Sequence, residues 1–317
     1  MYRSLALVGV LILAVLGFLY VKVYLQSAGY LSGVLSDVDV QERIKAAETL
    51  SKMGEGAAPA AAALVAALQD ESPAVKNYAR AALEGLGGRQ AEALPHLIKA
   101  IHGEQADAKV MAIGVIAKMG EAGRSAGPAL IVAFKDKDAS VRRAAVGALA
   151  QVAPGKETVD EMFAMLADKD GGVREEAGRA LREAAKSDAE VMDRLVACAK
   201  DKKGAEQLAA VKTLGDFGPL AAPAAAVLRD LAASPAASLA IASLTALRRV
   251  APDAPESVAV FTAALGRRED NIKATAAEAL LALAAKDGKA AAALRQALPT
   301  LPKNTQSRVE QALKAVK

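Results

Sequence analysis

The sequence predicts an all-α fold: an α-solenoid of about eight and a half helix pairs, preceded by one transmembrane helix. Three observations predict this fold class. Residues 4–21 form an uncharged apolar run, one motif then recurs nine times at a spacing of 32 or 33 residues, and only five aromatic residues follow residue 30. Periods of roughly 20 to 50 residues are typical of repeat architectures, in which each unit buries its apolar face only against its neighbours.

Residues 1–25 are predicted to form an N-terminal membrane anchor. The uncharged run over residues 4–21 would span about 27 Å as a helix, close to the thickness of the hydrocarbon core of a bilayer. Tyr20, Lys22 and Tyr24 follow it, where interfacial side chains are usual. A cleaved signal peptide is the alternative, but its apolar region is typically only about 7–15 residues long and ends at an A-x-A-like site. We therefore expect a retained anchor.

The charges beside this segment predict its orientation. The amino terminus and Arg3 precede the apolar run, and Lys22 follows it. The positive-inside rule then favours an N-terminus in the cytoplasm and a solenoid on the extracytoplasmic, periplasmic side of a single-pass protein. Secretion after signal cleavage is the alternative location.

Residues 37–317 are predicted to form the solenoid, and the first helix of each repeat carries a large apolar anchor. The anchors are Leu50, Leu83, Ile116, Leu149, Leu181, Leu214, Leu247, Leu280 and Leu313. The residues four positions earlier are Ala46, Ala79, Ala112, Ala145, Ala177, Ala210, Ser243, Ala276 and Val309. Residues at i and i+4 share one helix face, so the small residue admits the neighbouring helix and the large one fills the space beyond it.

A second helix is predicted in each full repeat, with a large apolar residue fourteen positions after the anchor. These residues are Leu64, Leu97, Leu130, Phe163, Leu195, Leu228, Phe261 and Leu294. Glycine ends several first helices, as expected for a residue that accepts the left-handed conformation. These glycines are Gly54, Gly87, Gly120 and Gly218.

Residues 26–36 are interpreted as a short junction that contains a capping helix over residues 29–36. Leu31 and Leu35 fall at the second-helix positions of a partial repeat before the first full one. The solenoid is therefore expected to begin with almost no free linker.

The repeats share a motif of the form D-x-D-x-x-V-R-x-x-A-x-x-A-L. Its clearest copies are DKDASVRRAAVGAL (136–149) and DKDGGVREEAGRAL (168–181), and DESPAVKNYARAAL (70–83) is close. The motif resembles the phycobilisome-lyase-like subfamily of HEAT repeats, and the resemblance covers residues 37–317. It implies an α-solenoid, and the subfamily's name raises a bilin-lyase-like enzyme or a chaperone-like tetrapyrrole binder as an alternative function. A 33-residue period also fits ankyrin repeats, but their T-P-L-H-x-A pattern is absent.

Two recurring sets of charged residues are candidates for binding sites. Pairs such as Asp136 and Asp138 resemble metal-binding carboxylates, but at helix starts they are expected to cap free N–H groups. A basic residue also recurs at one aligned position, and we expect it to pair with turn carboxylates of adjacent repeats rather than with an acidic partner. The members of this basic row are Arg43, Lys76, Lys109, Arg142, Arg174 and Lys273.

Residues with catalytic chemistry are few. His96 and His102 are the only histidines and fall on different helix faces, and Cys198, the only cysteine, has no histidine near it in sequence. No Gly-rich phosphate loop and no G-x-S-x-G motif is present. We therefore predict that the chain is not an enzyme and holds no metal and no cofactor.

The second helices are expected to line the concave face, as in HEAT-type solenoids. On them, Lys99, Val132, Met162 and Met165 form the candidate partner-binding groove, because exposed methionines suit adaptable binding surfaces. The alternative is that these side chains pack within the array. The favoured function is a membrane-anchored scaffold or adaptor that binds a protein or peptide through the solenoid surface.

Composition argues against the other functions. A tetrapyrrole site needs a sizeable pocket with some aromatic groups, and few aromatics are available. Nucleic-acid binding needs a basic stripe, but subtracting Arg3 and Lys22 from the 40 basic residues leaves 38 against 36 acidic ones. The predicted partners are therefore a protein or peptide and a membrane through residues 4–21, with no nucleic acid and no small-molecule substrate.

Overall fold

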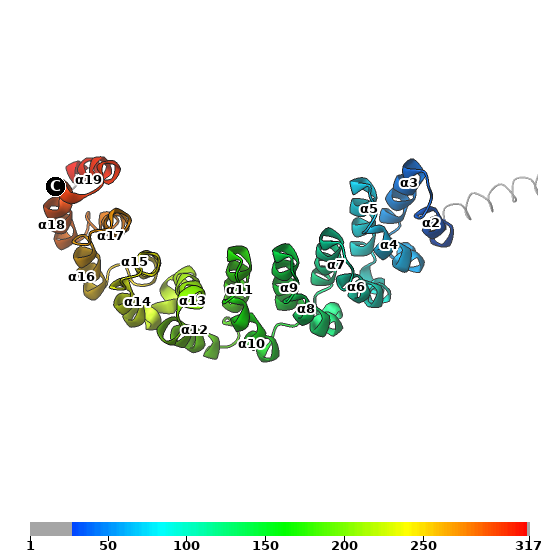
Figure 1. Ribbon diagram of the computed structural model, residues 1–317, viewed down its shortest axis with the longest axis horizontal. Coiled ribbons are helices and arrows are strands. Elements are labelled where there is room, and N and C mark those ends of the chain that lie inside the picture. The colour runs from blue at the N-terminus through cyan, green and yellow to red at the C-terminus, as the bar shows by residue number, and fades with distance from the viewer. Residues whose placement is uncertain (1–26, 316–317) are drawn as a thin grey trace, which may run out of the picture. The chain divides into compact units, whose positions relative to one another are not determined.

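The computed structural model describes residues 27–315, and every regular element in that range is a helix. The helices belong to two compact units, Met1–Pro154 (unit 1) and Gly155–Lys317 (unit 2). In each unit the helices alternate between two layers along the chain (Figure 1). This arrangement confirms the predicted all-helical solenoid.

Over residues 27–154, unit 1 has four helices in its first layer and four in its second, with short 3₁₀ helices between them. The first layer contains α3 (Val40–Ser51), α5 (Pro73–Glu84), α7 (Ala106–Lys118) and α9 (Ala139–Val152). The second contains α2 (Ala28–Val34), α4 (Ala61–Ala67), α6 (Leu94–Ile101) and α8 (Gly127–Ala133). The 3₁₀ helices are η1 (Gly54–Ala60), η2 (Gly87–Glu92) and η3 (Gly120–Ala126).

Unit 2 continues the alternation. Its first layer contains α11 (Gly171–Ala184), α13 (Gly204–Asp216), α15 (Ala237–Val250), α17 (Asp270–Leu281) and α19 (Lys303–Ala315). Its second contains α10 (Lys156–Met165), α12 (Glu190–Asp201), α14 (Ala225–Ala232), α16 (Pro255–Ala264) and α18 (Gly288–Ala297). The 3₁₀ helices are η4 (Gly218–Ala224) and η5 (Leu298–Thr300).

The repeated anchors form the core between the layers. Each anchor from Leu50 to Leu280 is fully buried, and the small residue four positions before it is buried as well. Small side chains let first-layer helices approach closely. At Gly215 on α13, an added Cβ would lie 2.9 Å from Cα of Ala246 on α15, so the two backbones are in contact there.

Glycine closes the turn after four first-layer helices. Gly54, Gly87, Gly120 and Gly218 have φ angles of 56°, 53°, 54° and 57°, in the left-handed region that only glycine adopts at little cost. The turn glycines read from the sequence therefore have the predicted conformation.

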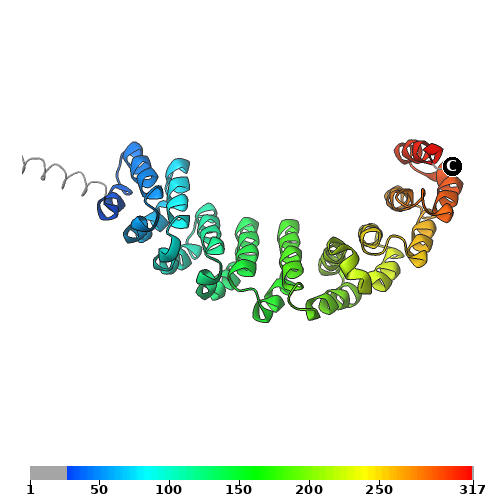
Figure 2. The same ribbon diagram turned by 180° about the vertical axis from the view of Figure 1, so that it is seen from behind.

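The two layers differ in how closely their helices pack. Neighbouring first-layer helices contact each other more extensively than neighbouring second-layer helices do. Within unit 2, α13, α15 and α17 accordingly lie on the inner side of the bend, and α12, α14 and α16 lie on the outer side (Figures 1 and 2). The expectation that second helices line a concave face is therefore wrong for unit 2, because its first-layer helices pack more closely, as in the backbone contact of Gly215 with Ala246.

The predicted fold class needs one correction. Among residues 27–315 no helix is long and apolar enough to cross a membrane, so the described structure contains the helical solenoid without the predicted transmembrane helix. The segment for which it was predicted, residues 4–21 of the anchor over residues 1–25, lies outside the described residues. The first described helix, α2, falls in the predicted junction and packs against α3 and η1.

Candidate partner-binding surfaces

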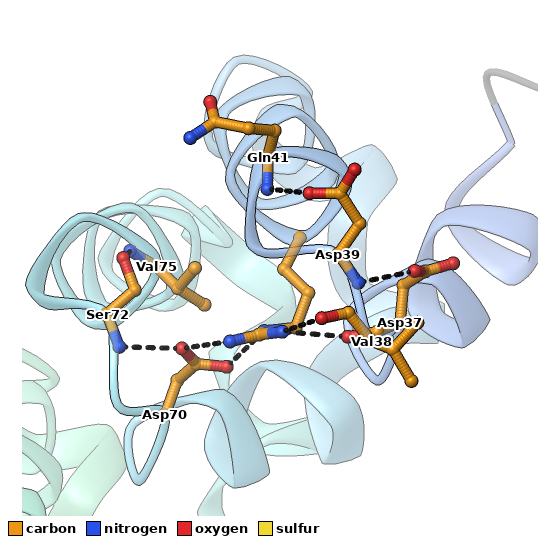
Figure 3. Close-up of polar contacts among 8 residues, drawn as sticks. Asp37, Val38, Asp39, Gln41, Asp70, Ser72 and Val75 are labelled. Carbon is orange, nitrogen blue, oxygen red and sulfur yellow. Dashed lines mark hydrogen bonds and ion pairs between the residues drawn. The ribbon is translucent and has the colours of Figure 1, made fainter.

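Members of the basic row join neighbouring repeats at their turns, beginning with Arg43. Figure 3 shows two such turns, with Asp37 and Val38 in one and Asp70 and Ser72 in the next. The guanidinium of Arg43 donates to both carboxylate oxygens of Asp70, over 2.7 and 3.2 Å. It also donates to the backbone carbonyls of Asp37 (2.8 Å) and Val38 (3.3 Å). Asp70 in turn accepts the backbone N–H of Ser72. One arginine thereby fixes two successive turns.

The same link recurs in unit 1 at Lys109, whose Nζ pairs with Asp136 at 2.7 Å. Nζ of Lys76 instead pairs at 2.5 Å with Asp107, which lies in the first turn of α7. Burial alone would raise the pKa of Asp136, but hydrogen bonds from Lys109 and from the backbone N–H of Asp138 hold it below its usual value. Lys109 therefore pairs with a turn carboxylate, as predicted, whereas Lys76 pairs with a carboxylate on the first helix of the adjacent repeat.

Asp138 caps α9, as the sequence predicts. Its carboxylate accepts the backbone N–H and the hydroxyl of Ser140, over 2.8 and 2.7 Å, and these bonds lower its pKa. Within residues 27–315, no group of three or more His, Cys, Asp or Glu side chains is arranged to hold a metal ion.

In unit 2 the aligned basic row is incomplete. Gln207 and Ala240 occupy two of its positions. Opposite Ala240, the turn that carries aspartate elsewhere has Arg267, which donates back to the carbonyl of Ser234 over 3.2 and 3.3 Å. The inter-repeat contact is kept, but the cation is supplied by the later repeat.

The four residues of the predicted groove have different surroundings. Lys99 on α6 and Val132 on α8 are exposed, with Val132 at 58%. Met162 and Met165 on α10 are buried, at 2% and 7% exposed. The two methionines therefore pack within the array, as in the alternative weighed above. A partner contact at Lys99 and Val132 stays a prediction.

A one-residue shift in register explains the burial of the methionines. The anchors Leu149 and Leu181 are 32 residues apart rather than 33, and the missing residue lies in the short connection between α9 and α10. Met162, not Phe163, therefore occupies the buried second-helix position. Phe163 is only half-buried, and the guanidinium carbon of Arg194 lies 4.4 Å from the centre of its ring. The shortened spacing was the signal for this shift in the sequence.

The outward face of the first layer differs between the two units, and sequence reasoning did not consider it. In unit 1 its central residues are small or apolar and at least partly exposed. They are Tyr78, Ala81, Val110, Met111, Gly114, Ala144 and Gly147, here called the apolar face. At Gly114, an added Cβ would have no other atom within 4 Å, so the surface is open there. In unit 2 the corresponding positions two residues before the anchors include Arg179 and Lys212.

Cys198 has the surroundings of a structural residue. The thiol is buried, and its Sγ lies 3.8 Å from a carboxylate oxygen of Glu206. Burial and the nearby negative charge of Glu206 raise the pKa of the thiol to about 11. It is therefore protonated at neutral pH, and a protonated thiol is a poor nucleophile.

Comparisons with known proteins agree with this fold. Residues 94–182 match the HEAT repeats family. The chain is similar to a chain in the complex of Kap95p with RanGDP, at 14% identity and a TM-score of 0.64 over 90% of this chain. It spans only 45% of that longer chain. The molecule is thus an α-solenoid of HEAT-like repeats.

Two other solved structures are similar with lower scores. The complex of CpcE and CpcF of phycocyanin lyase from Nostoc has 21% identity and a TM-score of 0.40, over 74% of this chain and 91% of that one. The Escherichia coli protein YibA has 19% identity and a TM-score of 0.43, over 81% and 95%. No curated protein matches the chain in sequence.

Proposed function

We propose that this chain is a protein-interaction scaffold that binds a protein or peptide along the apolar face of unit 1. The observation that carries the proposal is the partial exposure of that face on three successive first-layer helices, α5, α7 and α9. Contiguous exposed apolar surface commonly marks a site of protein interaction.

The composition of the apolar face suits a polypeptide ligand. Ala81, Gly114 and Gly147 leave room for a partner's backbone to approach the helices closely. Tyr78 and Met111 lie beside them and supply large contact surfaces, one rigid and one adaptable. A similar solenoid occurs in the complex of Kap95p with RanGDP, where the ligand is a protein. We propose no catalytic activity for the chain, which is consistent with the protonated thiol of Cys198.

Two variants with the same added charge test which face binds. Gly114→Glu places a carboxylate on the apolar face at a position with open space, so the helix should form normally. Val132→Glu places the same charge on the exposed second-layer surface. Each variant and the wild type is used as bait in extracts of the source cells, with circular dichroism to verify the fold.

We expect one or more specific partners to be lost with Gly114→Glu and kept with Val132→Glu. If Gly114→Glu retains every partner of the wild type, the apolar face is not the binding surface. If only Val132→Glu loses a partner, the surface around Lys99 and Val132 binds instead.

A further inference from the structure

Three cations lie on three consecutive first-layer helices of unit 2 and form no ion pair with a described residue. They are Arg182 on α11, Lys212 on α13 and Arg248 on α15, here called the cation cluster. Lys212 is exposed, and Arg182 and Arg248 are half-buried. These three helices are consecutive members of the layer, and each packs against the next.

The carboxylates near the cation cluster already have partners. Glu176 pairs with Arg179 on the same helix. Glu183 pairs with Lys186 at 2.6 Å, and that hydrogen bond holds the pKa of Glu183 below its usual value. Asp216 pairs with Arg249 at 2.6 Å.

Two acidic residues of these helices remain. Glu175, the remaining carboxylate of α11, lies about two helical turns before Arg182. Glu206, near the start of α13, pairs with Lys202 at 3.5 Å. None of the three cations therefore forms an ion pair with these carboxylates, although the charge of Arg182 contributes, after Lys186, to the lowered pKa of Glu183.

The repeat fixes how the three cations are spaced. Arg182 and Arg248 each follow their anchor by one residue, and Gly215 occupies that position on the helix between them. Lys212 precedes Gly215 by three residues, so it lies on the same side of α13 one turn earlier. Packed helices are about 8–10 Å apart, so the cluster extends roughly 20 Å across three helices. An extended peptide of about six residues covers that distance at roughly 3.3 Å per residue.

Arg182 has an unused hydrogen-bond donor. Its Nε is buried and has no acceptor. Moving the guanidinium toward a carboxylate would therefore break no hydrogen bond at Nε. It would also remove the free-energy penalty of a buried donor that has no acceptor. Arg182 and Arg248 also lie in the last turns of their helices, where a positive charge stabilises the helix dipole. Because Lys212 is not in a last turn, that structural role does not account for it.

We propose that the cation cluster binds an acidic segment of a protein partner, lying extended across α11, α13 and α15. Carboxylates spaced along such a segment would reach the three cations in turn, and guanidinium groups favour carboxylates as bidentate partners. The inference rests on the proposed function only in that the ligand is part of a protein, since it needs neither the apolar face nor unit 1.

A defined peptide tests the cation cluster separately from the apolar face. The probe is a fluorescein-labelled octapeptide of alternating Glu and Ser, titrated with the full-length chain at low salt and followed by anisotropy. The test variant is R182Q/K212Q/R248Q. The control variant, K200Q/R229Q/K289Q, removes from the second layer of the same unit three cations that form no ion pair with a described residue, two of them also in last helical turns. If circular dichroism shows that the triple test variant unfolds at a lower temperature than the wild type, the single variant K212Q replaces it in the titration.

We expect the Kd of the peptide to rise at least about tenfold in the test variant, from three lost ion pairs, and less than about twofold in the control. K212Q should weaken binding by about threefold. Gly114→Glu should leave peptide binding unchanged, so failure of the apolar face and failure of the cation cluster give different results.

Three outcomes would overturn the proposal. The wild type could fail to bind the peptide, or the two triple variants could weaken binding equally, which would show a general charge effect. A single-stranded DNA octamer could bind more tightly than the peptide and lose that binding in the test variant, which would assign the cluster to nucleic acid.

Discussion

Asp136 is the residue whose removal should disturb the contact between repeats most clearly. In Asp136→Ala, the ion pair with Lys109 at 2.7 Å is lost, and so is the acceptor for the backbone N–H of Asp138 at 2.9 Å. The side chains of Lys109 and Asp136 are only 11% and 12% exposed, so water replaces the lost partner poorly.

The magnitude follows from these two losses. A hydrogen bond to a charged group contributes about 1.5–3 kcal/mol, and removing one partner of a fully buried ion pair costs about 3–5 kcal/mol. Because this pair retains some exposure, we expect Asp136→Ala to lower the free energy of unfolding by about 2–4 kcal/mol.

Urea unfolding followed by far-ultraviolet circular dichroism measures this change. Adding Lys109→Met to Asp136→Ala should recover part of the lost stability, because no unpaired charge is then left between the repeats. A destabilisation below about 0.5 kcal/mol, as for an exposed ion pair, would show that the link does not hold the repeats together.

The same contact predicts a dependence on pH. The carboxyl pKa of Asp136 is lower in the folded chain than its ordinary value of 3.8. The stability it contributes is therefore fully present above pH 3.8 and is lost as the pH falls through the lower folded value. The stability difference between wild type and Asp136→Ala should shrink in that acidic range and stay constant near neutral pH.

Four further substitutions or reactions test other parts of the fold. Gly120→Ala forces alanine into a left-handed turn and should lower the free energy of unfolding by about 1 kcal/mol. Gly114→Ala lies on an open helix surface and should raise that free energy by about 0.5–1 kcal/mol, and urea titrations compare the two variants. Gly215→Ala should lower stability by about 1–3 kcal/mol, because its Cβ would meet the backbone of Ala246; unchanged stability would show that α13 and α15 separate freely. Cys198, with a pKa of about 11, should react with iodoacetamide at pH 8 at least about a hundredfold more slowly in the folded chain than in urea, and equal rates would contradict its burial.

The sequence predicted the features that repeat. The anchor recurs nine times, a small residue stands four positions before eight of the anchors, and the turn glycine recurs four times, so the physical role of each is visible in the sequence alone. The pairing of Arg43 with Asp70 was also predictable, because both recur where a helix start meets a neighbouring turn.

The sequence did not place the features that occur once. The single missing residue before α10 moves Met162 into the core and turns Phe163 partly outward, and a count of spacings shows that a residue is missing but not where. The direction of bending depends on how closely the helices of each layer pack. Contacts such as that of Gly215 with Ala246 determine this packing, and they are visible only in the three-dimensional structure. Whether Arg182 has an acceptor likewise depends on the conformations of its neighbours.

The turn chemistry also bears on how a protein of this kind can change length during evolution. If residues 71–136 were deleted, Asp70 would join Lys137 and Asp138, and an Asp-Lys-Asp turn would be restored beside Arg43. The helix that follows would bring Val141 and Ala148 in place of Val75 and Ala82, which are the same residue types and are buried in the same way. Loss or duplication of whole repeats in the gene could therefore shorten or extend the surface without new compensating mutations.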